Sequence, residues 1–160
     1  MEKALDLQEA TFIVKDFLHS EFGIKKMPTI KMNNRLGRST LGQFVEAENR
    51  RKKSTIELAT KIESWDFCTK HSLLQANIST LLHECIHYAL YQKELPYDDG
   101  NVRFELELKQ RGIHSNYTRD ELKNKWKRKS NVTQLLEQCD SCFVKDFKKH
   151  YETIILEQRK

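Results

Sequence analysis

The sequence contains the motif H-E-x-x-H at residues 83–87, inside an apolar stretch that covers residues 74–90. Apolar residues recur in this stretch at the spacing of a helical face, which predicts a buried α-helix. Residues four positions apart lie on one face of a helix, about one turn apart. His83 and His87 can therefore offer two imidazole nitrogens to a single tetrahedral Zn²⁺.

Glu84 lies next to these two histidines, where it can accept a proton from a zinc-bound water instead of binding the metal. The alternative is an ordinary core helix that carries two histidines and a glutamate. A chance H-E-x-x-H in a chain of this length is expected on the order of one per cent of the time or less. We therefore predict a zinc site with His83 and His87 as ligands and Glu84 as the general base.

The chain length of 160 residues predicts one domain, and a charged content of 32% predicts a well-solvated surface. The formal charge of +5 fits a polyanionic partner such as nucleic acid, although many proteins reach this value without one. No stretch has a signal-peptide pattern or membrane-spanning length, so we expect a soluble cytoplasmic protein without membrane contact. The four cysteines are too few and too scattered for a disulfide framework.

Helical periodicity over residues 6–22 predicts an amphipathic N-terminal helix, which Gly23 ends. Three short stretches with alternating apolar residues follow, at residues 29–32, 40–45 and 53–59. They predict a small three-stranded antiparallel sheet next to the metal helix. The edge of such a sheet can receive an extended peptide as an added strand, although a purely structural sheet is the alternative.

A catalytic zinc site normally has three protein ligands, and the two histidines leave one to be found. We expect it after the metal helix, where residues 95–100 predict a turn and residues 104–111 a further helix. The candidates are acidic: Asp98, Asp99, Glu105 and Glu107. Spacing alone does not choose among them.

Two groups of basic residues are candidates for contact with nucleic acid. The first surrounds the predicted strands and could contact phosphates or form a solvated loop: Arg35, Arg38, Arg50, Arg51, Lys52 and Lys53. The second surrounds Trp126: Lys123, Lys125, Lys127, Arg128 and Lys129. The Trp126 ring could stack on unpaired bases, or it could pack against an exposed basic helix.

Cys139 and Cys142 form one C-x-x-C pair, whereas a zinc ribbon needs two such pairs. A second, structural zinc at this pair would need further ligands, and His114 and His150 are conceivable ones. The segment after residue 115 is therefore interpreted as a basic C-terminal tail.

The order of these features resembles the SprT-like domain family of zinc metalloproteases. The resemblance covers roughly residues 5–115. It rests on the order of six features: the first helix, residues 34–38 (NRLGR), the strand at residues 54–58 (STIEL), the H-E-x-x-H helix, the pattern D-G-x-x-x-F at residues 99–104, and a helix that ends in Arg-Gly at residues 111–112. It implies a zincin-like α+β domain over residues 1–115. The tail, residues 116–160, resembles half of the four-cysteine zinc ribbon with which many relatives end.

The resemblance also implies functional roles. His83 and His87 match the metal ligands and Glu84 the general base of the family. The third ligand of the family is normally a histidine, and the position aligned through Tyr97 and Phe104 is Asp99, a competent zinc ligand. The metal set implied by the resemblance is thus His83, His87 and Asp99.

The function implied is a zinc metalloprotease, a hydrolase that acts on proteins bound or crosslinked to DNA. Some relatives do so in DNA–protein crosslink repair, stimulated by the DNA, so single-stranded or crosslinked DNA is an expected partner. Two alternatives stay open. One is a repressor-cleaving H-E-x-x-H peptidase with Glu107 as third ligand; the other is a non-catalytic zinc-containing DNA-binding module. The sequence does not indicate an oligomeric state.

Overall fold

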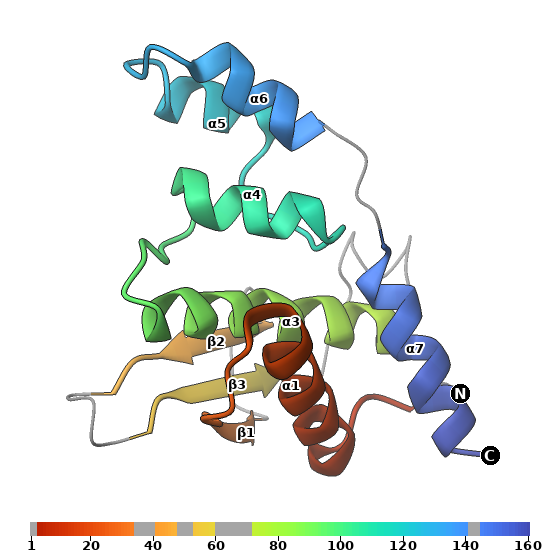
Figure 1. The fold of residues 1–160 in the computed structure, drawn as a ribbon. Coiled ribbons are helices and arrows are strands. Elements are labelled where there is room, and N and C mark those ends of the chain that lie inside the picture. Colours follow the sequence, from red (N-terminus) through yellow and green to blue (C-terminus); the bar gives the residue numbers. More distant parts are fainter. Residues whose placement is uncertain (1–2, 34–40, 48–52, 60–71, 141–144) are drawn as a thin grey trace.

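The computed structural model describes residues 3–33, 41–47, 53–59, 72–140 and 145–160. Within them the chain forms six helices and three strands (Figure 1), which confirms the predicted mixed α+β class. The elements are α1 (Leu7–Phe22), β1 (Thr29–Asn33), β2 (Gly42–Val45), β3 (Thr55–Ala59), α3 (Leu73–Gln92), α4 (Val102–Gln110), α5 (Arg119–Lys125), α6 (Val132–Asp140) and α7 (Phe147–Gln158).

Capping residues define both ends of α1 and the start of α3. Asp6 caps α1 through a capping box with Glu9, and Gly23 ends the helix in the left-handed conformation with a φ of 66°. Ser72 caps α3 by accepting a hydrogen bond from the backbone N–H of Gln75 at 3.0 Å. These local signals explain why the predicted bounds of both helices are confirmed to within two residues.

The three strands form a mixed sheet in the order β1-β3-β2, so the prediction of an antiparallel sheet is wrong for one of its two strand pairs. β2 pairs antiparallel with β3, whereas β1 pairs parallel with β3. The difference lies in the strand order: β3, whose Ile56 and Leu58 have no exposed surface, lies between β1 and β2, so β1 pairs with β3 and not with β2, and does so in the parallel direction. β2 is left at an edge of the sheet.

Helix α3 crosses the middle of the molecule, with the sheet on one side and α4 on the other (Figure 1). Residues 74–90 of this helix are buried except for Gln75, and its apolar side chains form the centre of the main hydrophobic core. Helix α7 packs against α3 and adds Phe147, Tyr151 and Ile155 to the same core. Part of the segment interpreted as a tail therefore belongs to the main core.

Helices α5 and α6 pack against each other and on α4, around a second, smaller core. Its buried members are Leu122, Trp126, Leu135, Leu136 and Cys139. Trp126 is only 2% exposed, so its ring has no free face for stacking on bases. Of the two interpretations of this basic segment, the one in which the Trp126 ring is packed is therefore correct. Burial raises the pKa of the Cys139 thiol.

Several sequence predictions concern residues outside the described ranges. Cys142, the second cysteine of the C-x-x-C pair, lies there, and so does most of the first basic group: Arg35, Arg38, Arg50, Arg51 and Lys52. None of the described helices has both the length and the apolar character that crossing a membrane requires.

The C-terminal end of α7 is tied to the start of α1 by Arg159. Its Nε and Nη2 atoms donate to the carboxylate of Glu9 at 2.7 and 2.8 Å, and Nη1 and Nη2 donate to the carbonyl oxygens of Lys3 and Ala4. The hydrogen bond from Arg159 lowers the pKa of Glu9, although burial opposes this shift. The pair is mostly buried, so removing Arg159 leaves the Glu9 carboxylate with only its hydrogen bond from the backbone N–H of Asp6 among the described contacts.

Replacing Arg159 by Met is expected to lower the free energy of unfolding by about 1–3 kcal/mol at pH 7. The folded-state pKa of Glu9 lies below its unfolded value, so this stabilisation is present above about pH 4.5 and is lost as the pH falls through the folded pKa. Urea unfolding of both proteins at pH 7 and pH 3 measures the difference. Lys160→Met, at an exposed neighbour, is the control; an equal loss at both pH values would contradict the role of the ion pair.

Candidate metal centre

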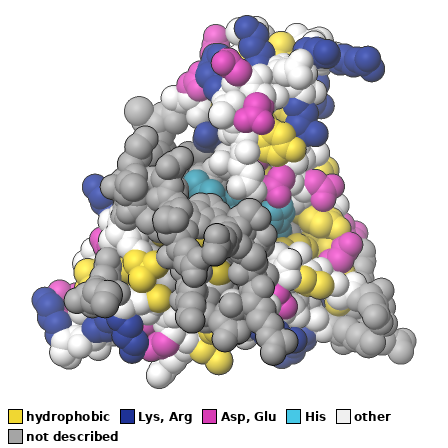
Figure 2. Space-filling model, turned by 180° about the vertical axis from the view of Figure 1, so that it is seen from behind, with side chains coloured by type: hydrophobic (Ala, Val, Ile, Leu, Met, Phe, Trp, Pro, Cys, Tyr) yellow, Lys and Arg dark blue, Asp and Glu magenta, His cyan; other side chains and the backbone are white. Residues whose placement is uncertain are grey.

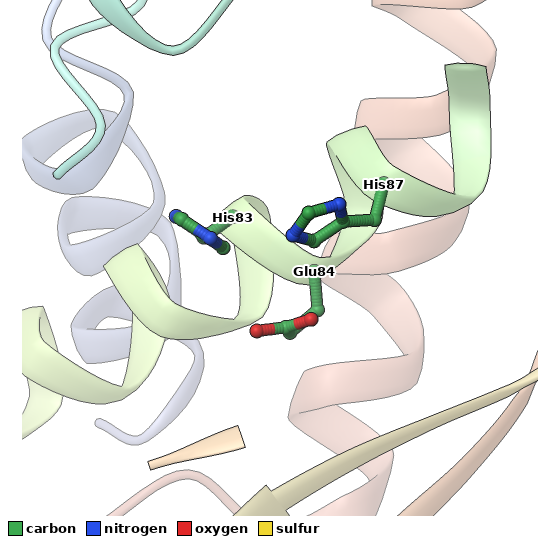
Figure 3. Close-up of side chains that lie close together, drawn as sticks. All are labelled: His83, Glu84 and His87. Carbon is green, nitrogen blue, oxygen red and sulfur yellow. The ribbon is translucent and has the colours of Figure 1, made fainter. Parts of the chain in front are cut away.

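His83 and His87 project from the same face of α3, one turn apart, with Glu84 between them in sequence (Figure 3). The residues His83, Glu84 and His87 are buried, with 2%, 7% and 7% of their surfaces exposed. One ligand atom from each of the three lies within 4.8 Å of the others, a spacing at which they could hold a metal ion. The predicted placement of the motif on one helical face is therefore confirmed.

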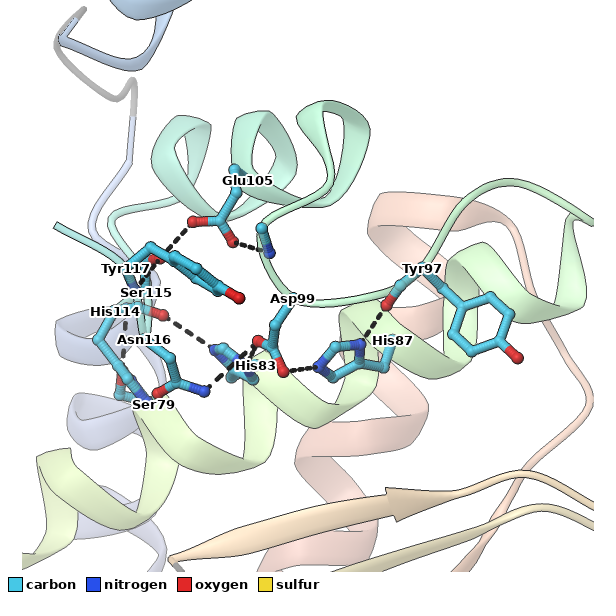
Figure 4. A network of polar contacts seen from close by, with 11 residues as sticks. Ser79, His83, His87, Tyr97, Asp99, Glu105, His114, Ser115, Asn116 and Tyr117 are labelled. Carbon is cyan, nitrogen blue, oxygen red and sulfur yellow. Dashed lines mark hydrogen bonds and ion pairs between the residues drawn. The ribbon is translucent and has the colours of Figure 1, made fainter. Parts of the chain in front are cut away.

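The turn between α3 and α4 brings the carboxylate of Asp99 over both imidazoles (Figure 4). Asp99 Oδ1 lies 3.0 Å from His83 Nε2, and Asp99 Oδ2 lies 3.5 Å from His87 Nε2. Metal–ligand bonds of about 2.0–2.1 Å in a tetrahedral zinc site separate the ligand atoms by about 3.4 Å. Both observed distances are close to that separation, although each histidine faces a different oxygen of Asp99, so the carboxylate lies where it could share a metal ion with the two imidazoles.

Backbone carbonyl groups determine which nitrogen of each imidazole faces Asp99. His83 Nδ1 lies 2.9 Å from the carbonyl oxygen of His114, and His87 Nδ1 contacts the carbonyl oxygen of Tyr97. A carbonyl oxygen can only accept, so each Nδ1 carries the hydrogen and donates it. In the neutral imidazoles the lone pairs on Nε2 then point at the carboxylate of Asp99. The two Nε2 atoms and the Asp99 carboxylate are then three hydrogen-bond acceptors that face one another, and they need a positive charge between them. Orientation of the ring by a backbone carbonyl is typical of metal-binding histidines.

The ionisation of the centre agrees with this arrangement. Burial acts to lower the pKa of His83, but the hydrogen bond with Asp99 and the charge of Glu84 outweigh it, and the pKa is raised. Burial acts to raise the pKa of Asp99, but the two imidazoles outweigh it, and the pKa is lowered. The metal-free centre thus favours a positive charge next to an ionised Asp99.

Glu84 differs from Asp99 in the direction of its pKa shift. Burial raises the pKa of Glu84, and the charges of His83 and His87 only partly oppose this. A carboxylate with a raised pKa is a stronger proton acceptor near neutral pH, whereas one with a lowered pKa remains an anion. The two carboxylates are therefore suited to different tasks, Glu84 to proton transfer and Asp99 to binding a cation.

The other candidates for the third ligand have different partners. Glu105 is fully buried and accepts hydrogen bonds from the backbone N–H of Gly100 and from the Ser115 hydroxyl. Glu107 pairs with the guanidinium groups of Arg103 and Arg111. Asp98 lines the adjoining cleft. Of the four acidic candidates, Asp99 is the one whose carboxylate contacts both histidines.

A cleft of about 390 Å³ opens beside the three side chains. It lies between the edge strand β2 and the turn before α4, and its lining includes Phe44, Glu84, His87, Tyr97, Asp99 and Asn116. Histidine side chains are visible from outside near the middle of the molecule (Figure 2), and the side chain of Asp99 is 38% exposed. Within the described part of the chain, the cleft leaves one side of the three side chains accessible, whereas structural metal sites are closed by a fourth protein ligand.

Sequence patterns did not reveal the residues that support the centre. His114 was considered only as a ligand for the C-x-x-C pair, but its carbonyl oxygen holds His83, its ring stacks on His83 at 5.0 Å, and its Nδ1 lies 2.7 Å from the Ser79 hydroxyl. The ring of Phe104 stacks on His87 at 4.0 Å. The pattern D-G-x-x-x-F includes Phe104 but does not show that it contacts His87, and no motif marks His114, whose contacts depend on the path of the loop after α4.

Gly42 of β2 is a further supporting residue. A Cβ atom added there would lie 2.8 Å from Thr80 Cγ2 and 2.9 Å from the carbonyl oxygen of Glu57, both too close. The absence of a side chain thus allows the edge strand to lie directly against α3, one turn before Glu84. Glycine inside a strand is the sequence signal for such a close approach.

Comparisons of the chain with protein-family models, with curated proteins and with solved structures find no match. The resemblance to the SprT-like family therefore rests on the sequence motifs alone. What the centre can do follows from its own geometry: two buried histidines, one ionised aspartate and one glutamate of raised pKa meet at the side of an open cleft.

Proposed function

We propose that the protein is a metal-dependent endopeptidase of the SprT-like, zincin-like type, with Zn²⁺ held by His83, His87 and Asp99. The observation that carries this proposal is the carboxylate of Asp99 facing the Nε2 atoms of both histidines, whose Nδ1 atoms are engaged by backbone carbonyls. Imidazole nitrogen and carboxylate oxygen form the donor set that zinc takes in hydrolytic enzymes.

When bound, Zn²⁺ supplies Lewis acidity, which lowers the pKa of a coordinated water to about 7 and polarises a substrate carbonyl. Glu84 accepts the proton of the attacking water, helped by the raised pKa that burial gives its carboxylate. Glu84 then delivers this proton to the nitrogen of the leaving amine. The carbonyl groups of His114 and Tyr97 keep both imidazoles oriented while this occurs.

The position of β2 supports a protein substrate. This strand is at an edge of the sheet, and Gly42, Gln43 and Phe44 line the same cleft as Glu84 and His87. An extended peptide can add to an edge strand through backbone hydrogen bonds, which places successive peptide units along the strand. A peptide bound in this way would pass beside Glu84, as peptide-bond hydrolysis requires.

A basic surface on α5 and the turn that follows it supports DNA as a partner. The side chains of Lys123, Lys125, Lys127, Arg128 and Lys129 are all exposed, and dark blue side chains gather at this end of the molecule (Figure 2). Phosphate contacts by such residues hold nucleic acid without reading its sequence. We therefore propose DNA-bound or DNA-crosslinked proteins as the substrates, held near the cleft by their DNA.

The other two functions have less support. A repressor-cleaving peptidase with Glu107 as third ligand would require this side chain to leave Arg103 and Arg111. A non-catalytic zinc module would be expected to have a closed site, whereas Glu84, His87 and Asp99 line an open cleft.

The test is proteolysis of unfolded casein by chelator-treated protein before and after addition of Zn²⁺, with and without single-stranded DNA. Cleavage is expected only with Zn²⁺, to be faster with DNA, and to be absent in His83→Ala. His19→Ala, which removes an exposed histidine of α1, is the matched control and should behave as wild type. The proposal would be refuted if casein were still cleaved after chelation or by His83→Ala, or if fully zinc-loaded wild type did not cleave it. Cleavage at the same rate with and without DNA would refute the role of DNA alone.

A further inference from the structure

Gly100 directly follows Asp99, and side chains from two other parts of the chain hold its backbone. Its N–H donates to Glu105 Oε2 at 3.3 Å, and its carbonyl oxygen accepts from Trp126 Nε1 at 2.8 Å. Both partners are buried, Glu105 completely and Trp126 to all but 2% of its surface. The peptide units on either side of Gly100 cannot rotate without breaking one of these buried hydrogen bonds.

The end of α5 also touches Gly100 directly. A Cβ atom added to Gly100 would lie 2.7 Å from Lys125 Cε and 3.0 Å from Tyr117 Cε2, both tight contacts. The φ of Gly100 is +82°, which glycine adopts without strain. The turn that carries Asp99 is therefore in contact with side chains of Tyr117 and of Lys125 at the end of α5.

Trp126 is the link between this pair and the metal centre. Its ring belongs to the small core of α5 and α6, and its indole N–H, which can only donate, is used on the carbonyl oxygen of Gly100. No hydrogen bond joins Trp126 to Asp99, His83 or His87 among the described contacts. Trp126 therefore acts on the ligand Asp99 only through the backbone of Gly100.

We propose that Trp126 is a positioning residue of the metal centre, which fixes Asp99 against the two histidines by holding the carbonyl group of Gly100. The inference rests on the proposed metal site and adds a role for the α5–α6 pair. A ligand that is already held in place loses little freedom when the metal binds, so affinity is higher than for a mobile ligand. Residues that support metal ligands in this way typically contribute about 10–100-fold to metal affinity.

The test is Co²⁺ binding by Trp126→Phe, because the visible absorption of bound Co²⁺ reports both affinity and ligand set. Phe keeps an aromatic ring in the small core but removes the N–H donor. We expect Co²⁺ affinity to fall about 10–100-fold, and the spectrum at saturation to move towards that of Asp99→Ala. Leu136→Ala, which removes packing from the same core without a bond to Gly100, is the matched control and should keep Co²⁺ affinity within about twofold.

Wild-type affinity and spectrum in Trp126→Phe would overturn the inference, and so would an equal loss in Leu136→Ala, which would make the role merely structural. No Co²⁺ binding by the wild type would overturn the metal site as well, so the two failures are distinguishable.

If Trp126→Phe does not fold, the NMR resonance of the Trp126 indole N–H can be followed in the wild type instead. The chain has two tryptophans, so the indole resonance that remains in Trp65→Phe belongs to Trp126. It should shift when Zn²⁺ is added to wild type but not to Asp99→Ala, and a resonance that does not respond in wild type would overturn the inference.

Discussion

Glu84→Gln is expected to lower the kcat for peptide hydrolysis by about 10²–10⁴-fold, the usual contribution of a general base, while metal content stays at the wild-type level. The amide keeps the shape of the side chain but cannot accept a proton from water. Burial already penalises the charged form of Glu84, so the variant should be at least as stable as the wild type. Zinc content, kcat and urea unfolding of the purified variant measure these three expectations.

Glu137→Gln, which makes the same chemical change at an exposed position on α6, is the control and should leave kcat unchanged. Loss of zinc together with activity in Glu84→Gln would instead assign this side chain to the metal and not to proton transfer. Full activity with zinc present would remove Glu84 from the mechanism.

The second large effect is expected for Asp99→Ala, which should weaken zinc binding by more than about a hundredfold. Loss of a residue that only supports a ligand costs about 10–100-fold, and loss of the ligand itself should cost more. The two Nε2 atoms would remain, but among the described residues no other carboxylate forms an ion pair with both of them. Competition against a chromophoric zinc chelator measures the affinity.

Two neighbouring carboxylates provide controls for Asp99. Asp98→Ala removes an exposed carboxylate from the same turn and should keep zinc affinity close to wild type. Glu107→Ala should also keep zinc but lose stability, because Arg103 and Arg111 lose their partner. Loss of zinc in Glu107→Ala with retention in Asp99→Ala would favour the repressor-cleaving alternative.

Local patterns were sufficient where the contacts are local. The helical face that carries His83 and His87 follows from the apolar periodicity of residues 74–90. Both ends of α1 and the start of α3 follow from capping residues that act within one turn. The relation between the two histidines and Glu84 is likewise a property of a single helix. These features could be predicted because each depends on residues only a few positions apart.

Contacts between distant residues could not be derived in the same way. Strand patterns identified β1, β2 and β3 but not their order, because pairing depends on which strand is most buried in the finished core. The basic composition of the tail concealed the apolar face by which α7 joins α1 and α3. The same composition did not show whether the Trp126 side chain is exposed or buried. It is buried because α5 and α6 pack around it.

Two histidines and a glutamate at fixed positions on one helix, with acidic residues following, could be read from the amino-acid sequence alone. The folding of the turn before α4 then places Asp99, and not Asp98, Glu105 or Glu107, against both imidazoles. The reason is that this turn has no regular structure of its own and is held by side chains outside it, Glu105 on α4 and the more distant Trp126 at the end of α5. Helical geometry is set within four residues, whereas the path of a turn depends on what it packs against.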